Sequence, residues 1–205
     1  MTVFDEAFEK LPLVAILRGL RPEEAEGIGA ALYGAGFRLI EVPLNSPDPF
    51  ESIARLARSL PADAVLGAGT VLETGAVAHV RDAGGRLIVM PHGDVEIIRA
   101  AKAAGMWCVP GVATPTEAFA ALKAGADALK LFPAELITPA IVRAMRAVLS
   151  KETKLLPVGG INPDNMSDFR AAGVAGFGLG SALYKPGMDA ATVAANAKAF
   201  VGAWH

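Results

Sequence analysis

Cysteine is almost absent from this sequence, and so is any long uninterrupted hydrophobic run. Cys108 is the single cysteine among 205 residues, which excludes an intramolecular disulfide and a cysteine-based metal site. Charged residues, Gly or Pro interrupt each apolar run before the roughly 18 residues that a membrane span needs. The first residues, Met1 to Glu6, lack the basic and apolar regions of a signal peptide. We therefore expect a cytoplasmic protein with no membrane partner.

The sequence also lacks an excess of charge of either sign. The net charge is −2 at pH 7 and no basic block occurs, which disfavours nucleic acid as a partner. In contrast, 53% of the residues are hydrophobic, and the mean hydropathy of +0.41 is high for a chain without a membrane span. This excess predicts a large buried core together with an oligomer interface. The length favours one domain, residues 1–205.

Short apolar segments alternate with helical ones along the whole chain. The predicted strands are 13–17, 39–44, 64–70, 87–90, 107–109, 128–133, 155–158 and 176–179. Each is followed by a predicted helix, and one further short helix, 3–10, precedes the first strand. Eight strand–helix units indicate an α/β fold, a (β/α)8 TIM barrel with a short N-terminal helix. A doubly wound open sheet is the alternative, although it would usually contain fewer strands.

Two ionisable residues lie inside apolar strands, Lys130 and Glu41. A buried ammonium group must find a partner or lose its proton, and a lysine with a lowered pKa attacks carbonyl groups to form a Schiff base. The alternative is a structural lysine paired with a carboxylate. Glu41 could be that carboxylate, or it could move protons beside the amine, and these two interpretations are compatible.

In a barrel, the site forms where the strands end, so the residues there are candidates for binding. The glycine turns at Gly159-Gly160 and Gly180-Ser181 follow the last two strands, where barrels often bind phosphate, although tight turns need glycine in any case. Arg18 could clamp a carboxylate or be a surface charge. Thr70 could be only a turn residue. His92 could contact a ligand, but it has no second histidine nearby, so we expect no metal site.

Taken together, these motifs resemble the 2-keto-3-deoxy-6-phosphogluconate/galactonate aldolases. The matching segments occur in the family's order over nearly the whole chain: 16–19, 41–46, 67–71, 110–111, 130–133 and 158–160. The resemblance implies a class I aldolase on a (β/α)8 barrel, commonly a homotrimer, that acts on a phosphosugar acid and requires no metal or organic cofactor. It also implies roles for individual residues: Lys130 as the Schiff-base lysine, Glu41 as the acid/base, Arg18 and Thr70 at the pyruvate end, and Gly160, Gly180 and Ser181 at the phosphate end.

Two positions, Asn45 and Val158, are similar to the galactonate branch of this family, and a third, His92, departs from the galactonate pattern. The gluconate branch has Glu-Val-Thr-Leu-Arg-Thr at the second strand and Thr before the double glycine, where this chain has Asn45 and Val158. His92 stands where the galactonate pattern has asparagine. The resemblance therefore implies the galactonate substrate, with Val158, Asn45 and His92 as specificity residues.

Other functions fit parts of this pattern. Within the family, the alternatives are the gluconate epimer of the substrate and 4-hydroxy-2-oxoglutarate. Outside it, a phosphosugar isomerase or epimerase could use Glu41 as a base without a covalent lysine, and a sugar-phosphate binding protein would need neither residue. Lys130 distinguishes them, because only the aldolase needs it as a nucleophile.

Overall fold

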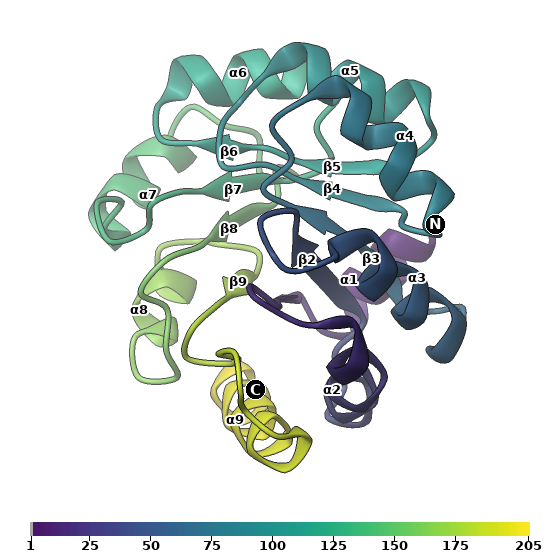
Figure 1. The fold of residues 1–205 in the computed structure, drawn as a ribbon. Helices are drawn as coiled ribbons and strands as arrows, with labels where there is room; N and C mark the ends of the chain where they lie inside the picture. Colours follow the sequence, from purple (N-terminus) through teal and green to yellow (C-terminus); the bar gives the residue numbers. More distant parts are fainter. Residues whose placement is uncertain (1) are drawn as a thin grey trace.

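The computed structural model describes residues 2–205, so Met1 of the predicted domain lies outside the described residues. Strands and helices alternate along this part of the chain (Figure 1). The strands are β1 (Leu13–Ile16), β2 (Leu39–Pro43), β3 (Val65–Gly69), β4 (Leu87–Val89), β5 (Trp107–Val109), β6 (Gly111–Val112), β7 (Leu129–Leu131), β8 (Leu155–Pro157) and β9 (Phe177–Leu179). The helices are α1 (Val3–Lys10), α2 (Pro22–Gly34), α3 (Pro49–Ser59), α4 (Thr74–Asp82), α5 (Val95–Ala103), α6 (Pro115–Lys123), α7 (Pro139–Arg146), α8 (Met166–Ala171) and α9 (Ala190–Trp204).

Each predicted strand is found, and the fifth, β5, ends at Val109 as the sequence predicts. A further two-residue strand, β6, begins at Gly111 and was not predicted. Pro110 has no N–H to donate, which interrupts the ladder, yet its carbonyl accepts a hydrogen bond from the N–H of Lys130 at 2.9 Å. The chain therefore stays extended beyond the proline: β5 pairs with β4, and β6 pairs with β7.

The strands pair in parallel and form two ladders, β5-β4-β3-β2-β1-β9 and β6-β7-β8. One bridge, between Val158 and Gly178, links the end of β8 to β9. The predicted α/β fold with parallel strands is confirmed, whereas the ladder is divided and not a single closed one. Because β1 to β5 are neighbours in chain order and β9 lies beside β1, the order lacks the reversal of a doubly wound sheet.

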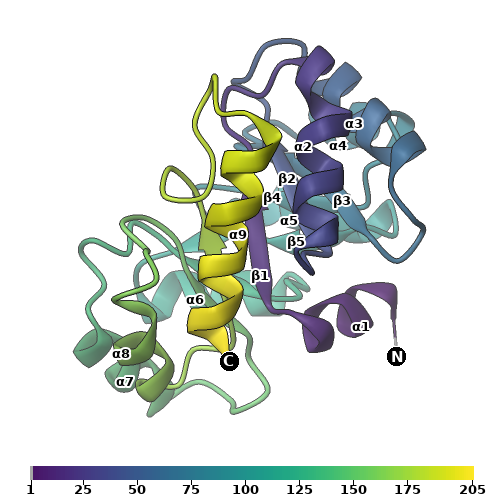
Figure 2. The ribbon, with the colours of Figure 1, turned by 90° about the horizontal axis from the view of Figure 1, so that it is seen from below.

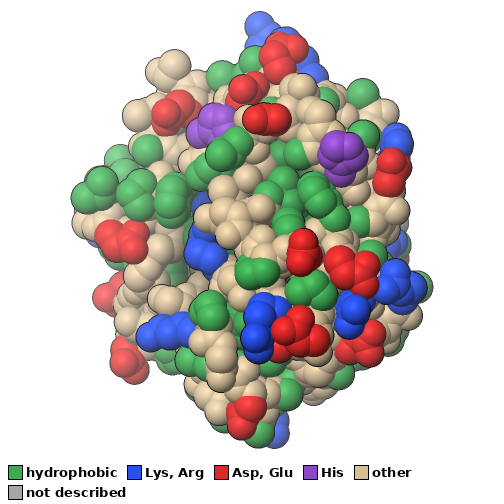
Figure 3. All heavy atoms as spheres, in the orientation of Figure 1, with side chains coloured by type: hydrophobic (Ala, Val, Ile, Leu, Met, Phe, Trp, Pro, Cys, Tyr) green, Lys and Arg blue, Asp and Glu red, His purple; other side chains and the backbone are tan. Residues whose placement is uncertain are grey.

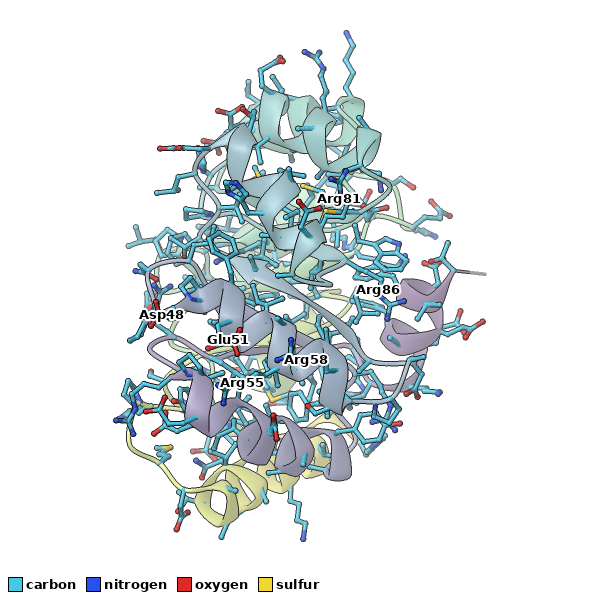
Figure 4. All side chains as sticks on the ribbon, turned by 45° about the vertical axis from the view of Figure 1, so that its right-hand side comes forward. Asp48, Glu51, Arg55, Arg58, Arg81 and Arg86 are labelled. Carbon is cyan, nitrogen blue, oxygen red and sulfur yellow. The ribbon has the colours of Figure 1, made fainter. Side chains whose placement is uncertain are left out.

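The helices begin where their sequences favour a start. Pro occupies the first turn of α2, α3, α6 and α7, where its missing N–H costs nothing. Thr114 caps α6, and Glu117 accepts the Thr114 N–H at 2.8 Å, which completes a capping box. On α3, Arg55 pairs with Glu51 one turn earlier at 2.8 Å, on the outer surface shown in Figure 4.

Alternate strand residues face two different hydrophobic layers. Leu13, Ala15, Ile40 and Val42 belong to the larger layer between the strands and the helices that surround them in Figure 1. The other set faces inward and packs against α1. It comprises Val14, Leu39, Val65, Leu87, Val89, Val109, Ala128 and Leu156. The period of two along each strand thus divides the core into an outer and an inner layer.

Helix α1 stands apart from the other helices, at one end of the strands (Figure 2). Its residues Phe4, Ala7 and Phe8 are buried in the inner layer. The Phe4 ring stacks on Trp107 of β5 with 5.6 Å between centroids, and Asp5 pairs with Lys154 at 3.1 Å. This helix therefore covers the end of the strands at which they begin.

The surface mixes both signs of charge. On the face shown in Figure 3, acidic and basic side chains are interspersed among hydrophobic ones. Among residues 2–205, no helix combines the length and the apolar character needed to cross a membrane.

Candidate active site

Lys130 and Glu41 both point into the inner layer, because each occupies an inward-facing position of its strand. Lys130 lies in the middle of β7 and its side chain is 5% exposed, and Glu41 lies in β2 and is 1% exposed. Both line a small cavity of about 10 Å³, room for roughly one water molecule. The rest of its wall is apolar or glycine: Val14, Ile16, Val89, Val109, Leu156, Val158 and Gly178. The structure thus brings together the two residues that the sequence singled out.

This apolar cavity changes the acidity of both groups. Burial raises the pKa of Glu41 to about 7, although the positive charges of Lys130 and Arg18 oppose this shift. Burial also lowers the pKa of Lys130, and Arg18 lowers it further, while Glu41 acts in the opposite direction. Near neutral pH the carboxyl group can therefore both accept and donate a proton, and the amine is more readily deprotonated than an exposed lysine.

The two groups interact without direct contact. Among residues 2–205, Glu41 and Lys130 are not joined by an ion pair within 4.0 Å, and Glu41 Oε2 has no hydrogen-bond partner. An unpartnered buried carboxyl oxygen is costly, which is typical of a functional site.

Gly69 provides the space for the Glu41 side chain. A Cβ atom at position 69, the last residue of β3, would overlap the Glu41 carboxylate. Thr70 follows with φ +53, a left-handed conformation that a threonine rarely adopts. The strained turn and the missing side chain together let β3 pass directly beside the carboxyl group.

Above the cavity, a larger pocket opens to solvent, with about 1130 Å³ of empty space that includes its mouth. Lys130 and Val158 line both spaces, so the amine lies at the boundary between them. The pocket also receives five further residues expected from the sequence: Arg18, Asn45, Gly160, Gly180 and Ser181. Phe132 also lines this pocket, and its ring centroid lies 4.7 Å from Lys130 Nζ.

Two expected residues lie elsewhere. Neither Thr70 nor His92 lines the pocket or the cavity. The His92 side chain is exposed, while its carbonyl accepts the N–H of Gly111 at 3.2 Å. The position of His92 directly after β4 suggested a side chain that faces the site, but the structure turns it toward solvent. Among residues 2–205 there is also no group of three or more metal-ligating side chains.

The turn at Gly159-Gly160 has a backbone conformation that favours glycine. Gly159 has φ +113 and Gly160 has φ +63. The side chain of Asn165 makes two hydrogen bonds to this turn. Its Nδ2 donates to the Gly160 carbonyl at 2.9 Å, and its Oδ1 accepts from the N–H of Asn162 at 3.0 Å. Helix α8 begins only after this turn and has six residues, so the turn itself forms this edge of the pocket.

Other pocket residues were missed by the sequence analysis. Glu135 lies against the Gly159-Gly160 turn, where its carboxylate fills the space that a side chain at position 159 would need. Tyr184, Lys185 and Pro186 line the opposite part, after β9. Burial raises the pKa of Tyr184 to about 12, with Glu24 adding to this shift. All four follow the carboxyl ends of strands, which is the one sequence signal that could have indicated them.

The chain as a whole matches known proteins. The family model described as "KDPG and KHG aldolase" matches residues 4–196. The chain belongs to the KDPG and KHG aldolase family. Two relatives, named 2-dehydro-3-deoxy-6-phosphogalactonate aldolases, come from Rhizobium meliloti (strain 1021), where the name carries "probable", and Escherichia coli (strain K12). The first is 51% identical over 94% of this chain and 91% of its own length, and the second is 45% identical over 96% of each chain.

A solved structure has the same fold. It is described as "Native KDPGal structure", has a TM-score of 0.93 and is 45% identical, with 95% of each chain covered. That protein thus shares the arrangement of strands and helices that positions Lys130 and Glu41 in this chain.

Proposed function

We propose that this protein is a class I aldolase that cleaves 2-dehydro-3-deoxy-6-phosphogalactonate into pyruvate and D-glyceraldehyde 3-phosphate. The observation that carries the proposal is the buried pair of Lys130 and Glu41 at the bottom of an open pocket. The names of the two relatives, each covering more than nine-tenths of the chain, support the galactonate substrate.

The reaction begins with the amine of Lys130, which burial keeps readily deprotonated. Its nitrogen attacks the C2 ketone of the substrate to give a carbinolamine, and loss of water gives a protonated imine. Glu41 takes the proton of the C4 hydroxyl group, directly or through a water molecule. The electrons of the C3–C4 bond move into the imine, which releases the aldehyde and leaves an enamine of pyruvate.

The second half of the reaction restores both side chains. Glu41, now protonated, returns its proton to C3 of the enamine, and water then hydrolyses the imine to release pyruvate and the free amine. A carboxyl group with a pKa of about 7 suits both directions of proton transfer. None of these steps uses a metal ion or an organic cofactor.

The two ends of the substrate are assigned by the chemistry of the pocket. Arg18 offers a guanidinium to the carboxylate at the pyruvate end, and Thr70 was expected to assist there, although it does not line the pocket. The backbone at Gly160 and Gly180 and the Ser181 hydroxyl offer donors to the phosphate. Val158, which lines both the pocket and the cavity, is the proposed specificity residue for the epimer.

We further infer that the two ladders close into a (β/α)8 barrel that assembles as a homotrimer in the cytoplasm. The Val158–Gly178 bridge and the hydrogen bond from Lys130 to Pro110 support closure, with β5 and β6 counted as one strand. Six large apolar side chains remain at least a third exposed, which supports an oligomer interface: Phe50, Leu72, Phe119, Leu136, Ile141 and Val148.

Borohydride reduction in the presence of pyruvate tests the covalent step. Mass spectrometry should find pyruvate's mass, less one oxygen atom, added to Lys130. Lys130→Met should fold normally, form no adduct and be inactive, whereas the surface control Lys198→Met should form the adduct as the wild type does. An adduct on another lysine, or none in the wild type, would instead favour the isomerase or the binding protein.

A further inference from the structure

Arg18 enters the pocket without a charged partner. Among residues 2–205 it forms no ion pair within 4.0 Å, whereas six other arginines pair with carboxylates: Arg21, Arg38, Arg55, Arg58, Arg81 and Arg99. Its partner is instead the neutral amide of Asn45, whose Oδ1 accepts a hydrogen bond from Arg18 Nη1 at 2.7 Å. The charge of Arg18 is therefore held in place without being neutralised.

The loop that carries Asn45 is itself fixed to the loop that carries Arg18. Ser46, 7% exposed, accepts the N–H of Gly19 on its hydroxyl oxygen at 2.9 Å and donates its own N–H to the Pro43 carbonyl at 2.9 Å. Gly19 in turn lies directly against the ring of Pro186, which also lines the pocket. Asn45 and Ser46, which follow β2, thus hold Arg18 and Gly19, which follow β1.

We propose that Asn45 is a positioning residue, which fixes the Arg18 guanidinium in the pocket of Lys130 so that its free N–H groups meet the substrate carboxylate. This role rests on the proposed aldolase function. A guanidinium has five N–H donors in one plane, and the bond to Asn45 occupies one of them. The remaining donors include an edge that can bind a carboxylate with two parallel hydrogen bonds.

The neutrality of the Asn45 amide is essential to this role. An aspartate at position 45 would accept the same hydrogen bond, but its charge would pair with Arg18 and weaken the attraction for a second carboxylate. An alanine at position 45 would leave the charge of Arg18 unchanged but would no longer orient its guanidinium. Substrate binding would then have to immobilise the Arg18 side chain, which should weaken the affinity about two- to tenfold.

The two variants Asn45→Ala and Asn45→Asp separate these effects when two ligands are compared. Pyruvate carries the carboxylate, and methyl pyruvate presents the same ketone without that charge. The measurement is the half-saturating concentration of each ligand for borohydride trapping on Lys130. We expect Asn45→Ala to raise this concentration about two- to tenfold for pyruvate, Asn45→Asp to raise it more, and both to leave methyl pyruvate nearly unchanged.

A double-variant comparison tests whether Asn45 acts through Arg18. Arg18→Ala should weaken the binding of pyruvate more than Asn45→Ala does. Adding Asn45→Ala to Arg18→Ala should cause no further loss of pyruvate affinity. Additive losses, or equal losses for pyruvate and methyl pyruvate, would overturn the positioning role and leave the aldolase function standing. If the wild type forms no pyruvate adduct on Lys130, the proposed function itself fails. Thermal unfolding of each variant confirms that the fold is intact.

Discussion

At the scale of the residue, burial gives ordinary side chains their chemistry. Lys130 and Glu41 are common residue types, but the apolar cavity shifts the pKa of each toward the neutral range. Val158, at the boundary of cavity and pocket, shows how a side chain without a polar group can still affect selectivity.

Glu41→Gln removes the group that we assign to proton transfer while keeping its shape. The variant should still form some imine with pyruvate, because Lys130 remains. Turnover should fall by about 10²–10⁴-fold, the usual contribution of general acid/base catalysis. Steady-state kinetics and borohydride trapping measure the two steps separately, and near-normal turnover would assign proton transfer to another group.

The same variant should alter how stability depends on pH. Glu41 has a pKa of about 7 in the folded protein and about 4.5 when unfolded, so between these values the folded state holds a proton that the unfolded state has released. The contribution of Glu41 to the free energy of unfolding is therefore fully present below pH 4.5 and is lost as the pH rises through about 7. The glutamine side chain does not titrate, so the stability of Glu41→Gln relative to the wild type should increase by roughly 3 kcal/mol as the pH rises across this window. Urea unfolding at several pH values measures the difference, and two parallel profiles would contradict the prediction.

Val158→Thr should relax the preference between epimers. The galactonate and gluconate substrates differ at C4, and a threonine hydroxyl can donate a hydrogen bond that valine cannot, at nearly the same volume. A hydrogen bond made with only one epimer contributes about 0.5–1.5 kcal/mol, or roughly two- to tenfold in rate. The ratio of kcat/KM for the two epimers should move toward the gluconate epimer. A wild type that strongly prefers that epimer would refute the galactonate assignment and leave the aldolase assignment intact.

At the scale of the element, α1 has a structural task that the other helices lack. It covers the beginning of the strands, and its residues Phe4 and Phe8 pack on the same inner layer whose Val14, Val89 and Leu156 also line the cavity. The helix thus separates the cavity from solvent on the side opposite the pocket. A low-dielectric cavity needs such a cover, because water would restore the ordinary pKa values.

Phe4→Ala tests whether the packing of α1 against the inner layer contributes to stability. The Phe4 ring is 1% exposed and stacks on Phe8 and Trp107, so its removal should leave a cavity and lower the free energy of unfolding by about 3–5 kcal/mol. Denaturant unfolding measures the loss. Glu9→Ala, on the exposed side of the same helix, is the matched control and should change stability by less than about 0.5 kcal/mol. Equal effects of the two changes would mean that α1 is not part of the cooperative core.

At the scale of the whole molecule, the exposed apolar side chains are the feature that the single chain leaves unexplained. Leu136 is 72% exposed although it directly follows Glu135, which lines the pocket. In a homotrimer such a side chain would be covered by a neighbouring subunit. The proposed interface would then lie close to the active site.

Leu136→Glu should weaken the proposed trimer. A carboxylate in an apolar interface must lose its hydration, so the variant should shift the sedimentation coefficient toward that of a monomer. Analytical ultracentrifugation over a range of concentrations measures the shift. Leu136→Met, which conserves apolar character and volume, is the control and should sediment like the wild type. A glutamate variant that stays fully assembled would place the interface elsewhere.

The sequence by itself determined the order of the elements and singled out two ionisable residues inside apolar strands. Apolar segments stopped by Pro or Gly located the strands, and a cation and an anion inside such segments indicated Lys130 and Glu41. These features are local: a buried charge is expensive wherever the strand lies, so it marks a site before the fold is known.

The tertiary structure alone decided which residues meet. Both faces of these strands are apolar, so the sequence left open that Lys130 faces the cavity while Leu131 faces the helices. It also left open that a second short strand, β6, follows Pro110 and pairs with β7, and that His92 turns toward solvent. The pairing of Arg18 with Asn45 joins loops 27 residues apart. Such contacts depend on the relative placement of several strands, and that placement follows from packing over the whole chain and not from any local pattern.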